Sequence, residues 1–61
     1  ITERELEVLD LLSRGYNSKA IAEQLFISPN TVEFHRRQLL KKTESRNIAE
    51  LIGNAYRQGI L

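Results

Sequence analysis

Apolar residues along the chain recur at helical spacing in four stretches, which short polar segments separate. Three apolar residues of the first stretch lie at intervals of three positions, as on one face of a helix: Leu6, Leu9 and Leu12. Thr2 and Glu5 fit a capping box, in which the threonine hydroxyl accepts from the Glu5 N–H and the carboxylate reaches back. Gly15 tolerates a positive φ and can end the helix. The pattern predicts a helix over residues 3–14.

Two further helices are predicted from the residues that can begin them. Asn17 can cap a short helix over residues 18–25. Ser28 followed by Pro29 is a stronger signal, because serine caps helices well and proline gives up only an N–H that lacks a partner in the first turn. This pair predicts a longer helix over residues 29–42.

A last helix is predicted over residues 48–57. Asn47 and Glu50 have the spacing of another capping box, and Gly59 marks the end. No stretch alternates between apolar and polar residues as a strand does. The sequence therefore predicts an all-α fold, a compact four-helix domain. Residues 1–61 are expected to form one domain, because chains below about 100 residues rarely divide.

The composition excludes most classes of active site. The chain has no cysteine, which rules out disulfides, thiolate nucleophiles and cysteine metal ligands, and its one histidine, His35, has no second ligand at a recognisable spacing. On a helix His35 shares a face with Val32 and Leu39, so we interpret it as a packed or hydrogen-bonded structural residue. No apolar run reaches the roughly 20 residues of a membrane span. We expect a small binding module, with no enzymatic activity, no metal, no cofactor and no membrane contact.

The net charge of +1 is unevenly distributed along the chain. Residues 1–27 hold three basic and five acidic side chains, a balance of −2, whereas residues 28–61 hold six basic and three acidic ones, a balance of +3. Four of those six basic side chains lie between positions 36 and 42: Arg36, Arg37, Lys41 and Lys42. Such a stripe fits the phosphate backbone of a nucleic acid, and an ordinary solvated face has the same composition. Charge alone leaves both interpretations open.

The second and third predicted helices are close enough in the chain to form a helix-turn-helix. Ala22 is small where the two helices must approach each other. Apolar residues follow the spacing of such a core: Ile21, Leu25, Ile27 and Val32. Many units of this type have glycine in the turn, where this chain has Phe26. We therefore expect that the turn need not enter the left-handed conformation that glycine favours.

The helix predicted over residues 29–42 has two different faces when its residues are spaced by about 100°. One face gathers polar and aromatic residues: Asn30, Glu33, Phe34, Arg37 and Lys41. The opposite face gathers Val32, His35 and Leu39. In a DNA major groove the first face can reach base edges, although a solvent-exposed amphipathic helix has the same pattern. A carboxylate repels phosphate, so Glu33 must either accept from a cytosine amino group or hold a neighbouring arginine.

The order and spacing of many residues make the pattern specific. They run almost continuously from position 2 to position 42: Thr2-Glu3-Arg4-Glu5-Leu6-Glu7-Val8-Leu9, Gly15, Lys19-Ala20-Ile21-Ala22, Leu25, Ile27-Ser28, Thr31-Val32, His35 and Lys42. In these residues the chain resembles the LuxR/FixJ/NarL-type helix-turn-helix domain of bacterial transcription regulators. The resemblance implies sequence-specific binding of double-stranded DNA in the bacterial cytoplasm, with the third helix as the recognition helix.

The resemblance also implies roles for individual side chains. It implies three base-facing residues: Glu33, Phe34 and Arg37. It implies five contacts to phosphates or the DNA backbone: Lys19, Asn30, Thr31, Lys41 and Lys42. The resemblance weakens after position 42, where the family usually has an apolar pair and this chain has Thr43 and Ser45.

The helix predicted over residues 48–57 has a second stripe beside the one expected to face the core: Ala49, Gly53 and Tyr56. Small residues at 49 and 53 let another helix come close. The resemblance implies a homodimer formed here, with two recognition helices at half-sites about 10 base pairs apart. The alternatives are a helix buried on two sides and a helical protein-interaction module that uses this stripe without binding DNA.

The chain starts at Ile1 and not at methionine, so we expect it to be the excised output domain of a longer regulator. The resemblance implies that the full-length protein is of the response-regulator kind or carries a ligand-sensing domain in place of a receiver. It also allows a contact with RNA polymerase.

Overall fold

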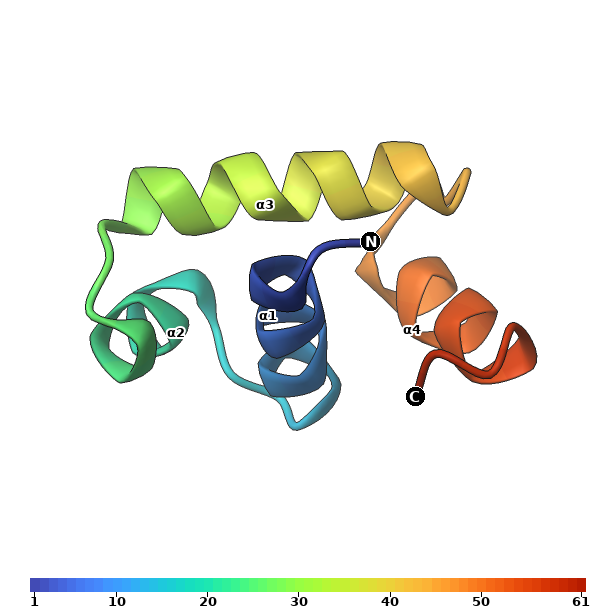
Figure 1. Ribbon diagram of the computed structural model, residues 1–61, viewed down its shortest axis with the longest axis horizontal. Helices are drawn as coiled ribbons and strands as arrows, with labels where there is room; N and C mark the ends of the chain where they lie inside the picture. Colours follow the sequence, from blue (N-terminus) through green and yellow to red (C-terminus); the bar gives the residue numbers. More distant parts are fainter.

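The computed structural model describes residues 1–61 and consists of four helices joined by short turns (Figure 1). In chain order the helices are α1 (Glu3–Ser13), α2 (Ser18–Leu25), α3 (Pro29–Lys42) and α4 (Ile48–Arg57). There is no strand, so the predicted all-α fold class is confirmed. Helices α2, α3 and α4 have the expected bounds, and α1 ends at Ser13, one residue early. None of the four is long and apolar enough to cross a membrane.

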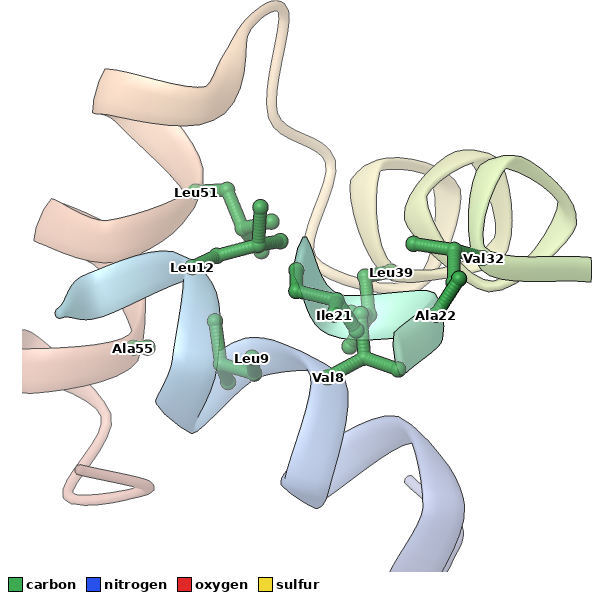
Figure 2. Close-up of a cluster of buried hydrophobic side chains, with 9 residues drawn as sticks. All are labelled: Val8, Leu9, Leu12, Ile21, Ala22, Val32, Leu39, Leu51 and Ala55. Atoms are coloured by element: carbon green, nitrogen blue, oxygen red, sulfur yellow. The ribbon is translucent and has the colours of Figure 1, made fainter. Parts of the chain in front are cut away.

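Helix α3 lies along one side of the molecule, and α2, α1 and α4 lie beneath it in that order in Figure 1. Helices α1 and α3 each pack against all three of the other helices, whereas α2 and α4 make no contact with each other. Nine buried apolar side chains from all four helices form the core (Figure 2): Val8, Leu9, Leu12, Ile21, Ala22, Val32, Leu39, Leu51 and Ala55. This arrangement buries one side of α3 and leaves the other side facing outward.

Polar side chains at the expected positions cap the first three helices. The Thr2 hydroxyl accepts a hydrogen bond from the Glu5 N–H (3.1 Å), and the Glu5 carboxylate accepts one from the Thr2 N–H (2.9 Å). Asn17 and Ser28 cap α2 and α3, each accepting from the N–H three residues later (2.9 and 3.1 Å). These bonds satisfy N–H groups that have no partner inside the helix, which is why the short α2 begins at a defined residue.

The capping box predicted at the start of α4 forms only in half. The Asn47 side chain accepts from the Glu50 N–H (2.8 Å), as expected. The Glu50 carboxylate, however, accepts from the Arg46 N–H (3.0 Å) and from the Arg46 guanidinium Nε (3.3 Å). The reciprocal half of the prediction was wrong, because Arg46 offers a charged donor one residue before Asn47.

The turn between α2 and α3 corrects another expectation. Phe26 adopts the left-handed conformation (φ 56°, ψ 43°), although it is not glycine. The geometry lets the Ile27 N–H reach back to the carbonyl of Ala22 (3.1 Å), a bond that closes the end of α2. Ile27 can then pack against the core, while the Phe26 side chain is 94% exposed. The left-handed residue is therefore required by the helix ending, whichever side chain occupies the position.

The linker between α3 and α4 is held by hydrogen bonds at Thr43 and Ser45, where the resemblance implied an apolar pair. The buried Thr43 hydroxyl donates to the carbonyl of Leu39 (2.7 Å) and lies 2.7 Å from the Ser45 hydroxyl. Asn54 of α4 donates from Nδ2 to the same Ser45 oxygen (2.8 Å). Because the side chains of Thr43, Ser45 and Asn54 are linked by hydrogen bonds, this network ties α4 to the end of α3 without an apolar pair.

Candidate nucleic-acid interface

The outward side of α3 carries the polar and aromatic residues that the helical projection grouped together. Four of these side chains are exposed: Asn30, Phe34, Arg37 and Lys41. Phe34 is 49% exposed despite being aromatic, and neither Arg37 nor Lys41 takes part in an ion pair within the chain. On the opposite side of the same helix Val32 and Leu39 are fully buried. The core therefore fixes the rotation of α3 and presents this face to the solvent.

Glu33 differs from its neighbours because the protein already holds its side chain. The carboxylate accepts from the hydroxyl of Ser18, the first residue of α2, and from Arg36 Nη1 (2.8 Å). Arg36 Nη1 also donates to the Ser18 hydroxyl (3.1 Å), which closes a three-membered cluster. Hydrogen bonds from Ser18 and then Arg36 hold the pKa of the Glu33 carboxyl below its ordinary value of 4.5. Of the two roles open to Glu33, holding a neighbouring arginine is the one seen in the free protein.

Ser18 and Arg36 were not among the predicted site residues. The Glu33–Arg36 spacing of three residues was readable as a helical ion pair. Ser18 lies 15 positions away from Glu33, and only the packing of α2 on α3 brings the two together. No signal in the local sequence marks that contact.

The start of α2 is concave and cationic. A shallow cavity of about 560 Å³ lies beside it, and its polar lining includes Ser18, Lys19 and Arg36. Lys19 is exposed, whereas Arg36 has a buried Nε without a hydrogen-bond partner. Helix N-termini attract anions because their first N–H groups point outward. Lys19 thus lies at the second position of α2, beside these N–H groups.

Thr31 and Lys42, two of the predicted phosphate contacts, are engaged within the chain to different degrees. Thr31 is exposed, and its hydroxyl lies 2.9 Å from that of Ser28. Lys42 Nζ donates to both carboxylate oxygens of Glu5 (2.8 and 2.9 Å), across α1 and α3. Only 4% of the Glu5 side chain is exposed, so this carboxylate requires a partner. Lys42 therefore has a structural role in the free chain, and 40% of its side chain remains exposed to solvent.

His35 packs as expected but without the hydrogen bond that was one of its two expected forms. The residue is half-buried, and its Nδ1 is buried with no partner. Its ring meets that of Phe34 edge to face, with centroids 5.7 Å apart and planes at 66°. This contact packs the His35 ring against the exposed Phe34 ring.

The second stripe of α4 lies on one face of the helix, at positions 49, 53 and 56. Ala49 is exposed, and Tyr56 is 61% exposed. Gly53 lies beneath the Arg57 side chain, because a Cβ at position 53 would stand 3.3 Å from Arg57 Nη1. The Arg57 guanidinium is held there by a hydrogen bond to Asn54 Oδ1. A second helix that packs on Gly53 must first displace this guanidinium.

Comparisons with known proteins agree with this geometry. The model of a family described as bacterial regulatory proteins, luxR family, matches residues 1–55. Over all 61 residues the chain is 39% identical to Oxygen regulatory protein NreC of Staphylococcus carnosus, and to the proteins of the same name from Staphylococcus haemolyticus and Staphylococcus aureus (strain JH9). The match covers 100% of this chain but only 28% of the length of each relative. The chain belongs to the luxR family of bacterial regulatory proteins, as a helix-turn-helix domain of DNA-binding transcription regulators.

Proposed function

We propose that this domain binds double-stranded DNA with α3 in the major groove and acts as the output domain of a bacterial transcription regulator in the cytoplasm. One observation carries the proposal: the outward side of α3 exposes Phe34, Arg37 and Lys41 with no polar partner in the chain, while the other side of the helix is locked into the core. An α-helix fits the major groove, and side chains of this length reach base edges there.

The proposed contacts divide between bases and phosphates. Phe34 and Arg37 face bases together with Glu33, since a guanidinium can donate two hydrogen bonds to guanine and an aromatic edge can meet a thymine methyl group. Five residues contact phosphates: Lys19, Asn30, Thr31, Lys41 and Lys42. Phosphate contacts fix the register and supply affinity, whereas base contacts discriminate between sequences. Lys42 also supports the fold through its ion pair with Glu5.

We propose further that two copies assemble on DNA through Ala49, Gly53 and Tyr56 of α4. The support is an exposed tyrosine beside two small residues on one face. Each copy then places α3 at one of two half-sites about 10 base pairs apart. The signal-receiving domain and any contact with RNA polymerase belong to the rest of the regulator in this proposal.

Two substitutions on α3 test the proposal because one should weaken base discrimination and the other should weaken binding to every sequence equally. Arg37→Ala should weaken binding to a selected duplex by roughly 1–3 kcal/mol and relax discrimination at one base pair. Lys41→Ala should weaken binding to all duplexes alike and flatten the slope of log affinity against log salt by about one unit. Fluorescence anisotropy over a series of salt concentrations, on duplexes selected from a random pool, measures both effects.

Arg14→Ala is the matched control, because Arg14 is also exposed but pairs with Asp10 at the end of α1. It should leave affinity and base preference unchanged. If Arg37→Ala and Lys41→Ala also left both unchanged, α3 would not be the DNA-contacting helix.

A further inference from the structure

The Glu33 carboxylate is held by one of its two oxygens. Both hydrogen bonds, from Ser18 and from Arg36, go to Oε1, and Oε2 receives none. The side chain is 43% exposed, at the edge of α3 that faces the start of α2. One oxygen is thus anchored to the protein while the other is free to accept a hydrogen bond from outside.

The anchor also makes a carboxylate tolerable next to DNA. The Arg36 guanidinium lies 2.8 Å from Oε1, and the charge of Arg37 acts in the same direction. These cations offset the repulsion between the carboxylate and DNA phosphates. They also keep the pKa of Glu33 low, so that the group remains ionised and can only accept hydrogen bonds.

The major groove offers few partners to a group that can only accept. Guanine presents N7 and O6 and thymine presents O4, all of them acceptors. Adenine presents an amino group beside the acceptor N7, which repels a second acceptor, whereas cytosine presents its N4 amino group alone. A fixed carboxylate oxygen on α3 therefore selects cytosine.

We propose that Ser18 and Arg36 are positioning residues that fix Glu33 so that its free oxygen reads the amino group of one cytosine in the bound duplex. This inference rests on the proposed function, because it requires α3 in the major groove. Ser18 fixes the orientation of the Glu33 side chain, because it binds the carboxylate from a different helix. This contact restricts the rotation of a flexible side chain before DNA binds. Arg36 supplies the compensating charge.

The test compares base preference at each position of a selected duplex with affinity for a random duplex. The wild-type chain should prefer cytosine at one position by roughly tenfold, the size of a typical single mismatch. Glu33→Gln keeps the anchored oxygen but turns the free one into an amino donor, so the cytosine preference should disappear. Because this variant also removes a negative charge, its affinity for random duplex should rise.

Ser18→Ala separates positioning from direct contact. It should reduce the cytosine preference several-fold while affinity for random duplex stays unchanged, and Ser18→Thr, which keeps the hydroxyl, should restore the preference. Glu23→Gln is the control for the charge change, because Glu23 is exposed on α2 without a partner in the chain. Ser13→Ala controls for loss of a hydroxyl. Circular dichroism confirms that each variant is folded.

Two negative results have different meanings. If the wild-type chain showed no salt-dependent binding to any duplex, the proposed function itself would fail. If it bound selected DNA while Glu33→Gln and Ser18→Ala kept the wild-type preference at every position, the proposed function would stand and the role of Glu33, Ser18 and Arg36 would be refuted.

Discussion

Glu5 and Lys42 are 37 positions apart in the chain, yet they join the first turn of α1 to the last turn of α3. The Glu5 carboxylate is also the second half of the α1 capping box, so one buried side chain serves a helix end and an ion pair. Burial raises the pKa of the Glu5 carboxyl, but hydrogen bonds from Lys42 and Thr2 and the charge of Lys42 outweigh burial and leave the pKa below 4.5. The ionised form of Glu5 therefore stabilises the fold.

Lys42→Met should lower the free energy of unfolding at pH 7 by about 2 kcal/mol, because a buried carboxylate loses its charged hydrogen-bond partner. Methionine keeps the aliphatic length, so packing changes little. Urea unfolding followed by circular dichroism measures the difference. Lys41→Met is the control, since Lys41 is exposed and forms no ion pair, and it should change stability by less than about 0.5 kcal/mol.

The same pair gives a pH dependence with a defined sign. A carboxyl whose pKa is lowered in the folded state contributes stability that is complete above its unfolded-state pKa and is lost as pH falls through the folded-state value. Wild-type stability should therefore drop on acidification below about pH 4.5. In Lys42→Met the Glu5 carboxyl loses the hydrogen bonds and the charge of Lys42 and keeps the hydrogen bonds with Thr2, so its pKa is lowered less. The difference in unfolding free energy between the two proteins should therefore narrow from pH 7 to pH 3. If the difference in unfolding free energy stayed constant over this pH range, Lys42 would not be what lowers the pKa of Glu5.

Among the structural elements, the turn after α2 combines backbone strain with an exposed aromatic ring. A left-handed backbone costs an L-residue with a Cβ roughly 1–2 kcal/mol, and Phe26 recovers little by burial because it is 94% exposed. Phe26→Gly should therefore raise the free energy of unfolding by about 1 kcal/mol. Thermal unfolding measures the gain. Phe26→Ala removes the ring but keeps the Cβ, so an equal gain from alanine would show that strain is not the cause.

Helix boundaries were predictable because their signals are local. Thr2, Asn17 and Ser28 each accept from an N–H three residues away, and the spacing of apolar residues identified much of the core, although Leu6 of the first stripe is 38% exposed. The left-handed conformation of Phe26 was missed, because an ending fixed by backbone hydrogen bonds can override residue preference. At the start of α4, the Glu50 carboxylate accepts from Arg46, whereas the spacing rule for capping boxes predicts only a bond to the N-cap residue Asn47.

The candidate site was predictable in outline but not in its internal contacts. Helical projection placed Phe34, Arg37 and Lys41 on one exposed face, because periodicity and burial follow from the sequence alone. The partners of Glu33 and Lys42 depend on how helices pack over 15 and 37 positions. Long-range contacts of this kind are set by the fold, so the sequence alone did not show that Glu33 and Lys42 have partners within the chain.

For the whole molecule, the small net charge of +1 implies modest affinity of a single copy for DNA. Two copies that bind one duplex at the same time would bind it with higher affinity than one copy does. Tyr56→Ala should weaken binding to a duplex with two half-sites about tenfold or more, while leaving binding to one half-site unchanged. Gel-shift titration on both duplexes measures this, with Gln58→Ala as the exposed control directly after the end of α4. Equal losses on both duplexes would argue against a dimer contact at Tyr56.

Nuclear magnetic resonance of the isotope-labelled chain, titrated with a selected duplex, shows directly whether the outward side of α3 contacts DNA. The largest changes in amide chemical shift should occur at the exposed residues of α3 and at Lys19, with smaller changes along the α4 stripe. Shifts confined to α4 or α1, or no shifts with any duplex while the fold is intact, would contradict a contact between α3 and DNA.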